Sequence, residues 1–456
     1  QYLGRLPIGD LNELQSIKMK ELNQFYRTWY APNNAVMVLS GKFDKVAVLK
    51  QIDAQFSSIV SRPVPTPIVV PKLDGAKIKQ REFTVQKGSD LAKFNIYLNG
   101  ADHSLVPALS MSPTLFTLQP SGHLYQSIVE SGLATAVQSS TWLDRDFNLV
   151  FMGAVYAPNH NATQVQTALN QGVEQTKNFN ETELNRIKSM TRNQADNIKN
   201  NAAALGSRLS DYYVAHQGNW GQYFKDLDAV YKLKPVDVNT AYKAFLRPEH
   251  RLTGNILPTP EAQKKALEQQ KIEPLKTLDQ QATMEEPLKD VSAYQTEVKQ
   301  YMQESKTYLL QKEKQIQRGK LKNGIQYALF PTNTRDDKTY ASISLDFGTA
   351  ELLKNKDVTL DLTAYLLFRA SKDKSLQQIA DKIIESGGFA GVSASGNSFS
   401  LQISAKKEKF EDFFQYFLDA IKTQLFEQTQ FDLIQSQSLS SLDRPYTEPS
   451  TVAALT

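Results

Sequence analysis

A short sequence pattern occurs twice in this chain. Residues 127–134 have the sequence Ser-Ile-Val-Glu-Ser-Gly-Leu-Ala, and residues 382–390 have the sequence Lys-Ile-Ile-Glu-Ser-Gly-Gly-Phe-Ala. In each copy an apolar helix would end at Glu-Ser-Gly, where glycine supplies the left-handed cap, and a strand would follow over Thr135–Ser140 or Gly391–Ser395. The pattern predicts two copies of one α+β domain. The alternative is a helix-to-strand exit that unrelated domains share.

The length and composition are those of a globular protein with several domains. A chain of 456 residues, 41% apolar and 22% charged, has room for roughly two to four domains. The net charge of +4 is spread without a polybasic block, which argues against nucleic acid as a partner. The longest apolar runs, such as Ala35–Leu39, have the length of a buried strand, so no membrane span is predicted.

The absence of cysteine limits the chemistry. With 0 cysteines the chain forms no disulfide, no thiolate zinc site and no thiol nucleophile, and it suits an oxidising or a reducing compartment. The sequence opens at Gln1 without an initiator Met or a signal-like apolar segment. We therefore expect that the N-terminus is a cut and that any targeting segment lies upstream.

Residues 1–62 are predicted to be the C-terminal remnant of a first α/β unit. A helix is expected over residues 10–30, with Asp10 as N-cap and Glu13 completing a capping box. A buried strand, Ala35–Ser40, and a second helix, Lys45–Phe56, follow. We expect this segment to dock on the next domain, and the strand edge to be covered by a second copy or by a remaining domain.

Residues 63–258 are predicted to form the second domain, an α+β unit. Its strands are expected at Glu82–Gln86, Phe94–Asn99, Phe147–Tyr156 and Arg251–Leu257, and its clearest helices at Gln164–Lys177, Glu181–Asn200 and Val236–Phe245. Residues 259–317 are rich in Gln, Lys and Glu and are interrupted by Pro274 and Pro287. They are predicted to form a charged helical connector, and composition leaves a flexible linker and an ordered helical hairpin equally open.

Residues 318–456 are predicted to form a third α+β domain, which we expect to be truncated. Strands are expected at Ile325–Phe330 and Ala341–Phe347, and helices at Thr359–Arg369 and Lys374–Glu385. A further strand, with alternating apolar residues, is expected from Phe399 to Ala405. The spacing of Phe410, Phe413, Phe414, Phe417 and Ile421 favours a helical core face over a peptide groove.

The sequence offers no self-sufficient active site. The histidines are His103, His123, His160, His216 and His250, and no two have the spacing of a ligand pair on one helix face. No G-x-S-x-G elbow, Walker loop or dinucleotide fingerprint occurs, and Glu285-Glu286 lies in the polar connector. We therefore assign no catalytic, cofactor-binding or metal-binding residue to this chain.

Several segments resemble the pitrilysin/insulinase family of zinc metallopeptidases. The resemblance rests on the stretches Leu6–Gly9, Phe25–Ala35, Gly41–Asp44, Ser121–Gln126, Glu130–Ala134 and Leu321–Gly324. It implies repeated α/β two-layer sandwich domains of the LuxS/MPP-like metallohydrolase type. In that family the first of these stretches closes the N-terminal domain, so the H-x-x-E-H motif and the glutamate ligand would precede Gln1.

The resemblance also implies that the site is degenerate in the third domain. The residues Leu366–Ala370 match those that follow H-x-x-E-H, which puts Asp361, Ala364 and Tyr365 at the His, Glu and His positions. In the second domain, Ile128 and Thr135 stand where a later domain of the family carries a substrate-gripping Arg and Tyr. Neither the zinc-binding residues nor the substrate-gripping pair is therefore expected in this chain.

The resemblance implies the central non-catalytic region of a zinc-dependent metalloendopeptidase, which would form scaffold and chamber wall. Zinc is then expected in the parent protein and not in this chain. The expected partners are a peptide or unfolded polypeptide substrate, the remaining domains or a partner protomer, and a second copy in a homodimer. The alternative is an inactive scaffold or regulatory subunit. A periplasmic or otherwise exported location is expected, with the cytoplasm as the alternative.

Overall fold

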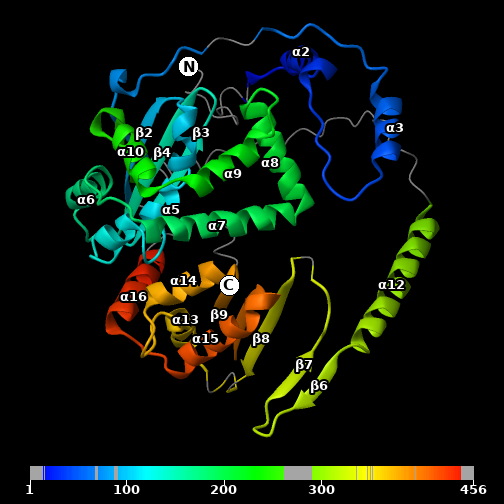
Figure 1. Cartoon of the computed structure of the whole chain (residues 1–456), viewed down its shortest axis with the longest axis vertical. Coiled ribbons are helices and arrows are strands. Elements are labelled where there is room, and N and C mark those ends of the chain that lie inside the picture. The colour runs from blue at the N-terminus through cyan, green and yellow to red at the C-terminus, as the bar shows by residue number, and fades with distance from the viewer. Residues whose placement is uncertain are drawn as a thin grey trace. The chain divides into compact units, whose positions relative to one another are not determined.

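The computed structural model describes residues 14, 16–66, 70–86, 91–260, 290–334, 336–346, 348, 349, 351, 353–395 and 397–442. The chain forms two compact units, residues 1–259 with 339–456 and residues 260–338. The fold is mixed α/β, as the sequence predicts (Figure 1). No helix in the described ranges is long and apolar enough to cross a membrane. The predicted domain limits at residues 62, 258 and 317 stay predictions.

The N-terminal helix differs from its prediction. It is α2 (Met19–Trp29), and its N-cap is Lys18 in an extended conformation. The predicted caps Asp10 and Glu13 lie outside the described residues. No residue of α2 is buried, and Phe25 remains 58% exposed. The apolar face expected to dock is therefore open to solvent.

The predicted strand Ala35–Ser40 is wrong. This segment, between α2 and α3 (Lys45–Phe56), has no ladder to any strand of the described residues. It passes instead beside helix α8 (Ala202–Ala215). There Val36–Leu39 line an apolar pocket together with Leu209 and Tyr213 of α8. An extended segment becomes a strand only when a neighbour supplies the hydrogen-bonding partners.

The second domain is built on a five-stranded sheet. Its strands are β1 (Glu82–Gln86), β2 (Leu91–Gly100), β3 (Ala136–Leu143), β4 (Phe147–Tyr156) and β5 (Arg251–Leu257). The order is β1-β5-β2-β4-β3. The β1–β5 pair is parallel and the others are antiparallel. The long β2–β4 ladder runs from Leu91 opposite Tyr156 to Gly100 opposite Phe147.

Helices cover this sheet and enclose the larger core. They are α4 (Val106–Leu109), α5 (Ser112–Thr117), the π-helix η5 (Tyr125–Val129), α6 (Ala162–Glu174), α7 (Glu181–Lys199), α8, α9 (Gln222–Lys232) and α10 (Pro235–Phe245). Phe116 is fully buried and meets Phe179 edge to face with ring centroids 5.4 Å apart. The core also contains Val150, Leu169 and Leu184. Burial of such side chains is the main source of stability.

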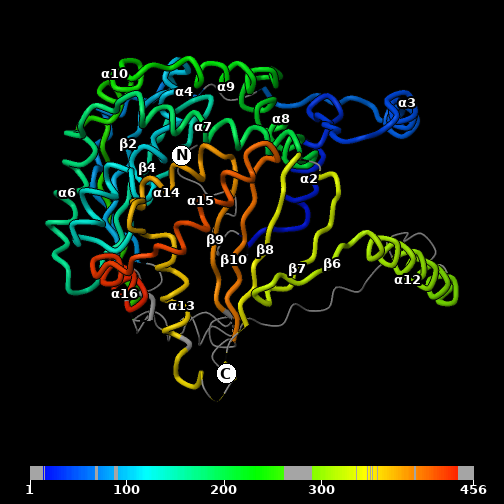
Figure 2. Tube along the Cα trace, turned by 60° about the horizontal axis from the view of Figure 1, so that its bottom comes forward, coloured from blue at the N-terminus to red at the C-terminus, as the bar shows by residue number. Residues whose placement is uncertain are grey.

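The third domain has a smaller sheet and its own core. Strands β8 (Lys338–Asp346), β9 (Phe389–Ser395) and β10 (Ser398–Lys406) lie in the order β8-β10-β9 (Figure 2). Its helices are α13 (Asp357–Leu366), α14 (Leu376–Ser386), α15 (Phe410–Lys422) and α16 (Gln428–Leu442). Phe413 and Phe417 are 0% exposed. The phenylalanine face of α15 is therefore core, as predicted.

The two domains repeat one order of elements. The second domain has η5, β3, β4, α6 and α7, and the third has α14, β9, β10, α15 and α16. In each, the two strands are antiparallel neighbours. The predicted left-handed glycines are present, with φ of 75° at Gly132 and 61° at Gly387. This correspondence favours duplication over a chance helix exit, although the first helix is of the π type.

The second compact unit, residues 260–338, contains a helix and a β-hairpin. Helix α12 (Val291–Glu313) has no buried residue, as expected of a solvated connector. Strands β6 (Gln317–Lys320) and β7 (Gln326–Leu329) pair antiparallel around the predicted Asn-Gly turn. The second arm of the alternative helical hairpin would fall in residues outside the described ranges.

The α15 core face predicts a difference between two phenylalanines. Phe417→Ala should lower the free energy of unfolding by about 3–5 kcal/mol, because it removes a buried ring and leaves a cavity. Phe426 is 58% exposed, so Phe426→Ala should cost less than about 1 kcal/mol. Urea denaturation followed by circular dichroism measures both. Equal losses would show that the α15 face is not core.

Candidate functional site

Helix α13 carries the residues that align with a zinc motif. Asp361 is exposed, Ala364 is 8% exposed and Tyr365 is 63% exposed. Asp361 and Tyr365 are one helical turn apart, but neither supplies an imidazole, and the alanine has no general base to offer. The three predicted positions on α13 therefore lack the ligands and the base of a zinc motif.

The two residues predicted to stand at substrate-gripping positions, Ile128 and Thr135, make contacts within the fold. Ile128 is 0% exposed within the larger core. Thr135 is 7% exposed, and its hydroxyl and backbone N–H both donate to Val155 O, at 3.1 and 2.8 Å. Neither side chain is free to hold a peptide.

His123 is the histidine with the closest side-chain partners. Its Nδ1 lies 2.7 Å from Thr176 Oγ1, its Nε2 lies 2.7 Å from Glu183 Oε1, and its ring stacks on Phe179 at 4.3 Å. Glu183 Oε2 also accepts from the Asn180 N–H at 2.8 Å. Both ring nitrogens and both carboxylate oxygens are thus engaged, so the group fixes the start of α7 and leaves no acid or base free.

The environment of Glu183 shifts its pKa. Burial raises this pKa, but the hydrogen bonds from His123 and from the Asn180 backbone lower it more, and the net shift is downward. A carboxyl with a lowered folded pKa stabilises the native state above its unfolded pKa. That contribution is lost as the pH falls through the folded value.

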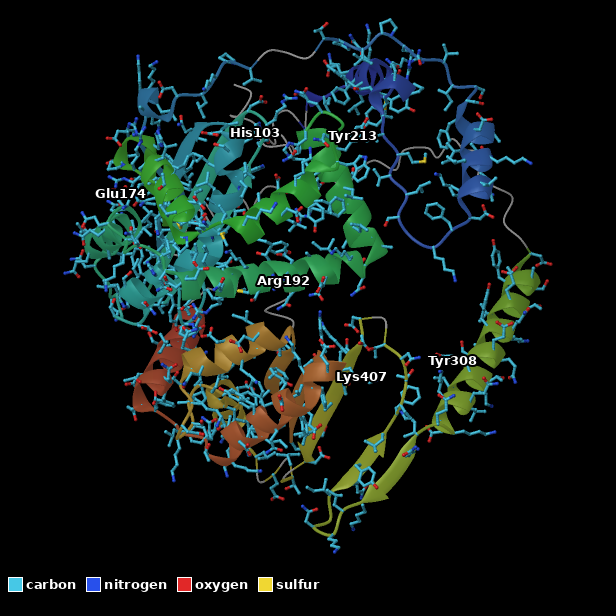
Figure 3. All side chains as sticks on the ribbon, in the orientation of Figure 1. His103, Glu174, Arg192, Tyr213, Tyr308 and Lys407 are labelled. Atoms are coloured by element: carbon cyan, nitrogen blue, oxygen red, sulfur yellow. The ribbon has the colours of Figure 1, made fainter. Side chains whose placement is uncertain are left out.

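The remaining histidines are separated or bound to backbone. His250 is 3% exposed with Nδ1 2.9 Å from Phe245 O, and His160 Nε2 lies 3.0 Å from Gly132 O. The fold does bring His103, which Figure 3 labels, close to His216, with ring centroids 5.9 Å apart. Sequence spacing could not predict this pair. No group of three His, Cys, Asp or Glu that could hold a metal occurs in the described part of the chain.

A buried polar cluster joins α6 to the sheet. Glu174, labelled in Figure 3, accepts from Tyr97 at 3.0 Å and pairs with Arg251. Burial first, and then the Glu174 charge, raise the pKa of the Tyr97 hydroxyl. A tyrosine with a raised pKa stays neutral, so this cluster is a structural tie between β2, β5 and α6.

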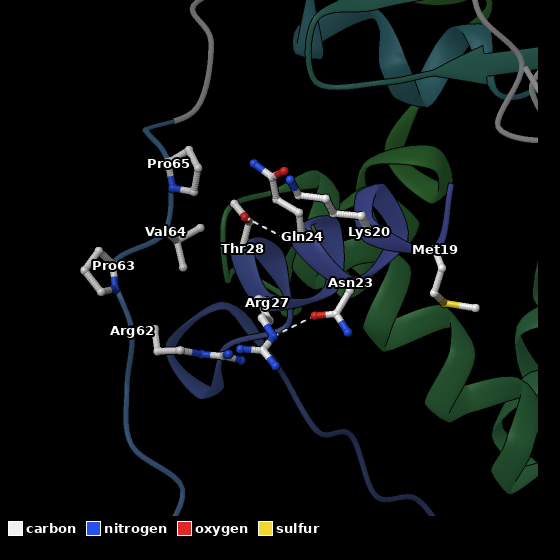
Figure 4. Close-up of a pocket in the computed structure, with 10 residues that line it drawn as sticks. All are labelled: Met19, Lys20, Asn23, Gln24, Arg27, Thr28, Arg62, Pro63, Val64 and Pro65. Carbon is white, nitrogen blue, oxygen red and sulfur yellow. Dashed lines mark hydrogen bonds between the residues drawn. The ribbon is translucent and has the colours of Figure 1, made fainter. Parts of the chain in front are cut away.

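A pocket lies beside α2. It has a volume of about 1030 Å³ and is lined by Lys20, Arg27 and Arg62 among polar and proline residues (Figure 4). Arg27 donates to Asn23 Oδ1 at 2.6 Å, and Arg62 donates to Tyr30 O. The lining holds no carboxylate and no imidazole, so this pocket lacks the groups that peptide hydrolysis needs.

The comparison with protein families explains this lack of chemistry. Residues 16–191 match the family model described as the peptidase M16 inactive domain. These residues are therefore similar to M16 peptidases. The predicted resemblance to the pitrilysin/insulinase family is confirmed, and the model that matches is that of an inactive domain.

Relatives of known description are zinc proteases. A stretch of 57 residues is 33% identical to a probable zinc protease PqqL of Haemophilus influenzae, and it makes up 12% of this chain and 6% of that protein. A protease from Helicobacter pylori is similar at 23% identity and a TM-score of 0.48, over 55% of this chain and 62% of that one.

A third similar protein is the periplasmic protease PqqL of Escherichia coli. It has 17% identity and a TM-score of 0.45, over 97% of this chain and 51% of that one. The chain therefore spans less than two thirds of each of these three relatives.

The lowered pKa of Glu183 predicts a pH-dependent effect of Glu183→Gln. Near pH 7 the variant should be less stable than the unmodified chain, because it loses the charge-assisted bond to His123. The difference should shrink as the pH falls below the ordinary glutamate pKa of 4.5. Urea unfolding at a series of pH values measures it. Glu181→Gln, in the same first turn of α7, is the control, and an equal pH trend in both variants would contradict the assignment.

Proposed function

We propose that this chain is the central non-catalytic region of a zinc-dependent metalloendopeptidase that encloses and hydrolyses peptides. The observation that carries the proposal is the match of residues 16–191 to an inactive M16 domain. The contacts of Glu183, Tyr97 and Thr135 support it, since each of these groups is engaged within the fold. The chain would supply scaffold and chamber wall.

The chemistry of such an enzyme would be carried by residues other than those described. Zinc in metallopeptidases polarises the scissile carbonyl and activates water. The residues at the motif positions, Asp361, Ala364 and Tyr365, do not form a ligand set. The contribution of this chain would be to hold the peptide-facing walls in place and exclude water around the substrate.

The surface of the described chain supports a role in assembly. Phe25, Tyr26 and Tyr30 of the N-terminal segment are 58–63% exposed, and clustered aromatic side chains of this kind mark an interaction surface. The partners we propose are a peptide or unfolded polypeptide as substrate, and the remaining domains or a partner protomer. A homodimer is a further candidate.

The second candidate is an inactive scaffold or regulatory subunit of an M16 peptidase. The absence of ligand residues on α13 is equally expected of it. An H-x-x-E-H motif in the polypeptide upstream of Gln1 would favour the enzyme, and its absence would favour the scaffold. An exported location is proposed, since one similar protein is described as periplasmic. The cytoplasm is the alternative.

The proposal predicts that the chain as given holds no stoichiometric zinc and cleaves no peptide. Metal content by mass spectrometry and hydrolysis of a fluorogenic peptide library test this. A double variant with Asp361→His and Tyr365→His is the positive control for the metal assay, because two exposed histidines one turn apart on α13 form a zinc-binding pair. One tightly held zinc per unmodified molecule, or chelator-sensitive cleavage, would overturn the proposal.

A further inference from the structure

The second and third domains do not share a hydrophobic core. Buried residues of the larger cluster all come from the second domain, between Tyr97 and Leu246. Those of the smaller cluster all come from the third domain, between Phe368 and Ala420. Both domains nevertheless belong to one compact unit. Contacts other than a common apolar core must therefore join them.

Helices α7 and α14 make the most direct contact between the two domains (Figure 1). Arg186 of α7 forms a fork with Asp381 of α14, in which Nη2 donates to Oδ2 at 3.0 Å and Nε donates to Oδ1. The side chains are 10% and 30% exposed. Gln377 also donates to Asp381 Oδ1 at 2.8 Å and holds the carboxylate in place. A bidentate, largely buried pair fixes both distance and orientation.

The same face of α7 recognises the end of α14. The Asn193 amide donates at 2.9 Å to Ile384 O, a carbonyl of the last turn of α14 that also accepts from the Gly387 N–H at 3.2 Å. Asn193 lies directly over Gly387, where an added Cβ would be 2.9 Å from Asn193 Oδ1. Two constraints therefore favour glycine at position 387. Its φ is positive, and a side chain there would collide with Asn193 of the second domain.

The third domain makes the corresponding contact in return. Helix α16 has the position in the third domain that α7 has in the second. Its Gln437 donates to Thr135 O at 2.9 Å, and Thr135 directly follows the Glu-Ser-Gly exit of the second domain. Each domain thus places its last repeated helix against the helix exit of the other. This reciprocal arrangement is that of a pseudo-two-fold interface.

Further polar contacts cross this interface. Lys406 Nζ lies 3.3 Å from Asp196 Oδ2, with both side chains more than a third exposed. A pocket of about 210 Å³ between α7 and α14 is lined by Thr182, Ser189 and Glu385 together with the Arg186 pair. Residues Arg186, Ser189 and Asn193 form one polar stripe of α7, whereas Leu184 and Ile187 face the core.

We propose that this polar seam, formed by α7 and α16 against the two helix exits, is a docking surface through which the second and third domains bind each other as separate bodies. The partner of each surface is the other domain of the same chain. The Arg186–Asp381 fork provides most of the specificity, and the connector only keeps the two domains at high local concentration. This proposal about the interface holds whether or not the proposed peptidase function is correct.

The test is a chain that can be cut in the connector. A specific protease site is inserted between Gln280 and Gln281, and the folded chain is cleaved. Sedimentation over a dilution series then gives the dissociation constant of the two pieces. The pieces should remain associated, and Arg186→Gln or Asp381→Asn should each raise the dissociation constant by roughly thirtyfold or more. Raising the salt from 0.1 to 1 M reduces the screening length from about 10 to about 3 Å and should weaken binding further.

Two controls make the result decisive. The charge swap Arg186→Asp with Asp381→Arg should recover part of the lost affinity, which a variant that fails to fold cannot do. Asp419→Asn removes an exposed carboxylate of α15 and should leave the affinity unchanged. Separation of the unmodified pieces, unchanged affinity in both single variants, or a folded charge swap that recovers nothing would each overturn the proposal.

Discussion

Two glycines with positive φ determine the course of both repeated domains. Gly132 and Gly387 adopt φ values of 75° and 61°, a region that costs residues with a Cβ about 1–2 kcal/mol. The left-handed residue ends the helix and directs the chain into an antiparallel strand pair, β3–β4 or β9–β10. The next helix then packs on that pair. At Gly387 the exit also receives Asn193 of the other domain, so one backbone conformation links the fold of a domain to its neighbour.

The polar groups of the second domain are used to hold elements together. Both oxygens of Glu183 accept hydrogen bonds at the start of α7, and Glu174 joins Tyr97 to Arg251 across the sheet. An acid–base catalyst needs a group that exchanges a proton with substrate, and a saturated pair does not provide one. The M16 match to an inactive domain and the hydrogen-bond pattern therefore support the same proposal, that this region builds a wall and does not carry chemistry.

Much of the fold could be predicted where periodicity and burial agree. Strands β1, β4 and β5 begin and end at the predicted residues, and helix α15 buries Phe413 and Phe417 of the predicted face. The segment 35–40 failed because a strand needs a partner, which local sequence does not show. Helix α8 was not singled out from the sequence, and none of its residues is buried in the structure. The sequence shows that no two histidines have the spacing of a metal motif. It does not show the proximity of His103 to His216, which depends on the tertiary fold.

The interface between the two repeated domains is polar and separate from their hydrophobic cores. Each repeat already buries its own apolar residues, so a second apolar interface would join the two cores into one rigid body. An ion-pair fork contributes less net binding energy than such a core, because desolvation offsets much of the attraction. It strongly penalises any other register, however, since Arg186 displaced from Asp381 would be left buried and unpaired. A reciprocal polar seam therefore fixes the orientation of the two domains while each domain keeps its own hydrophobic core.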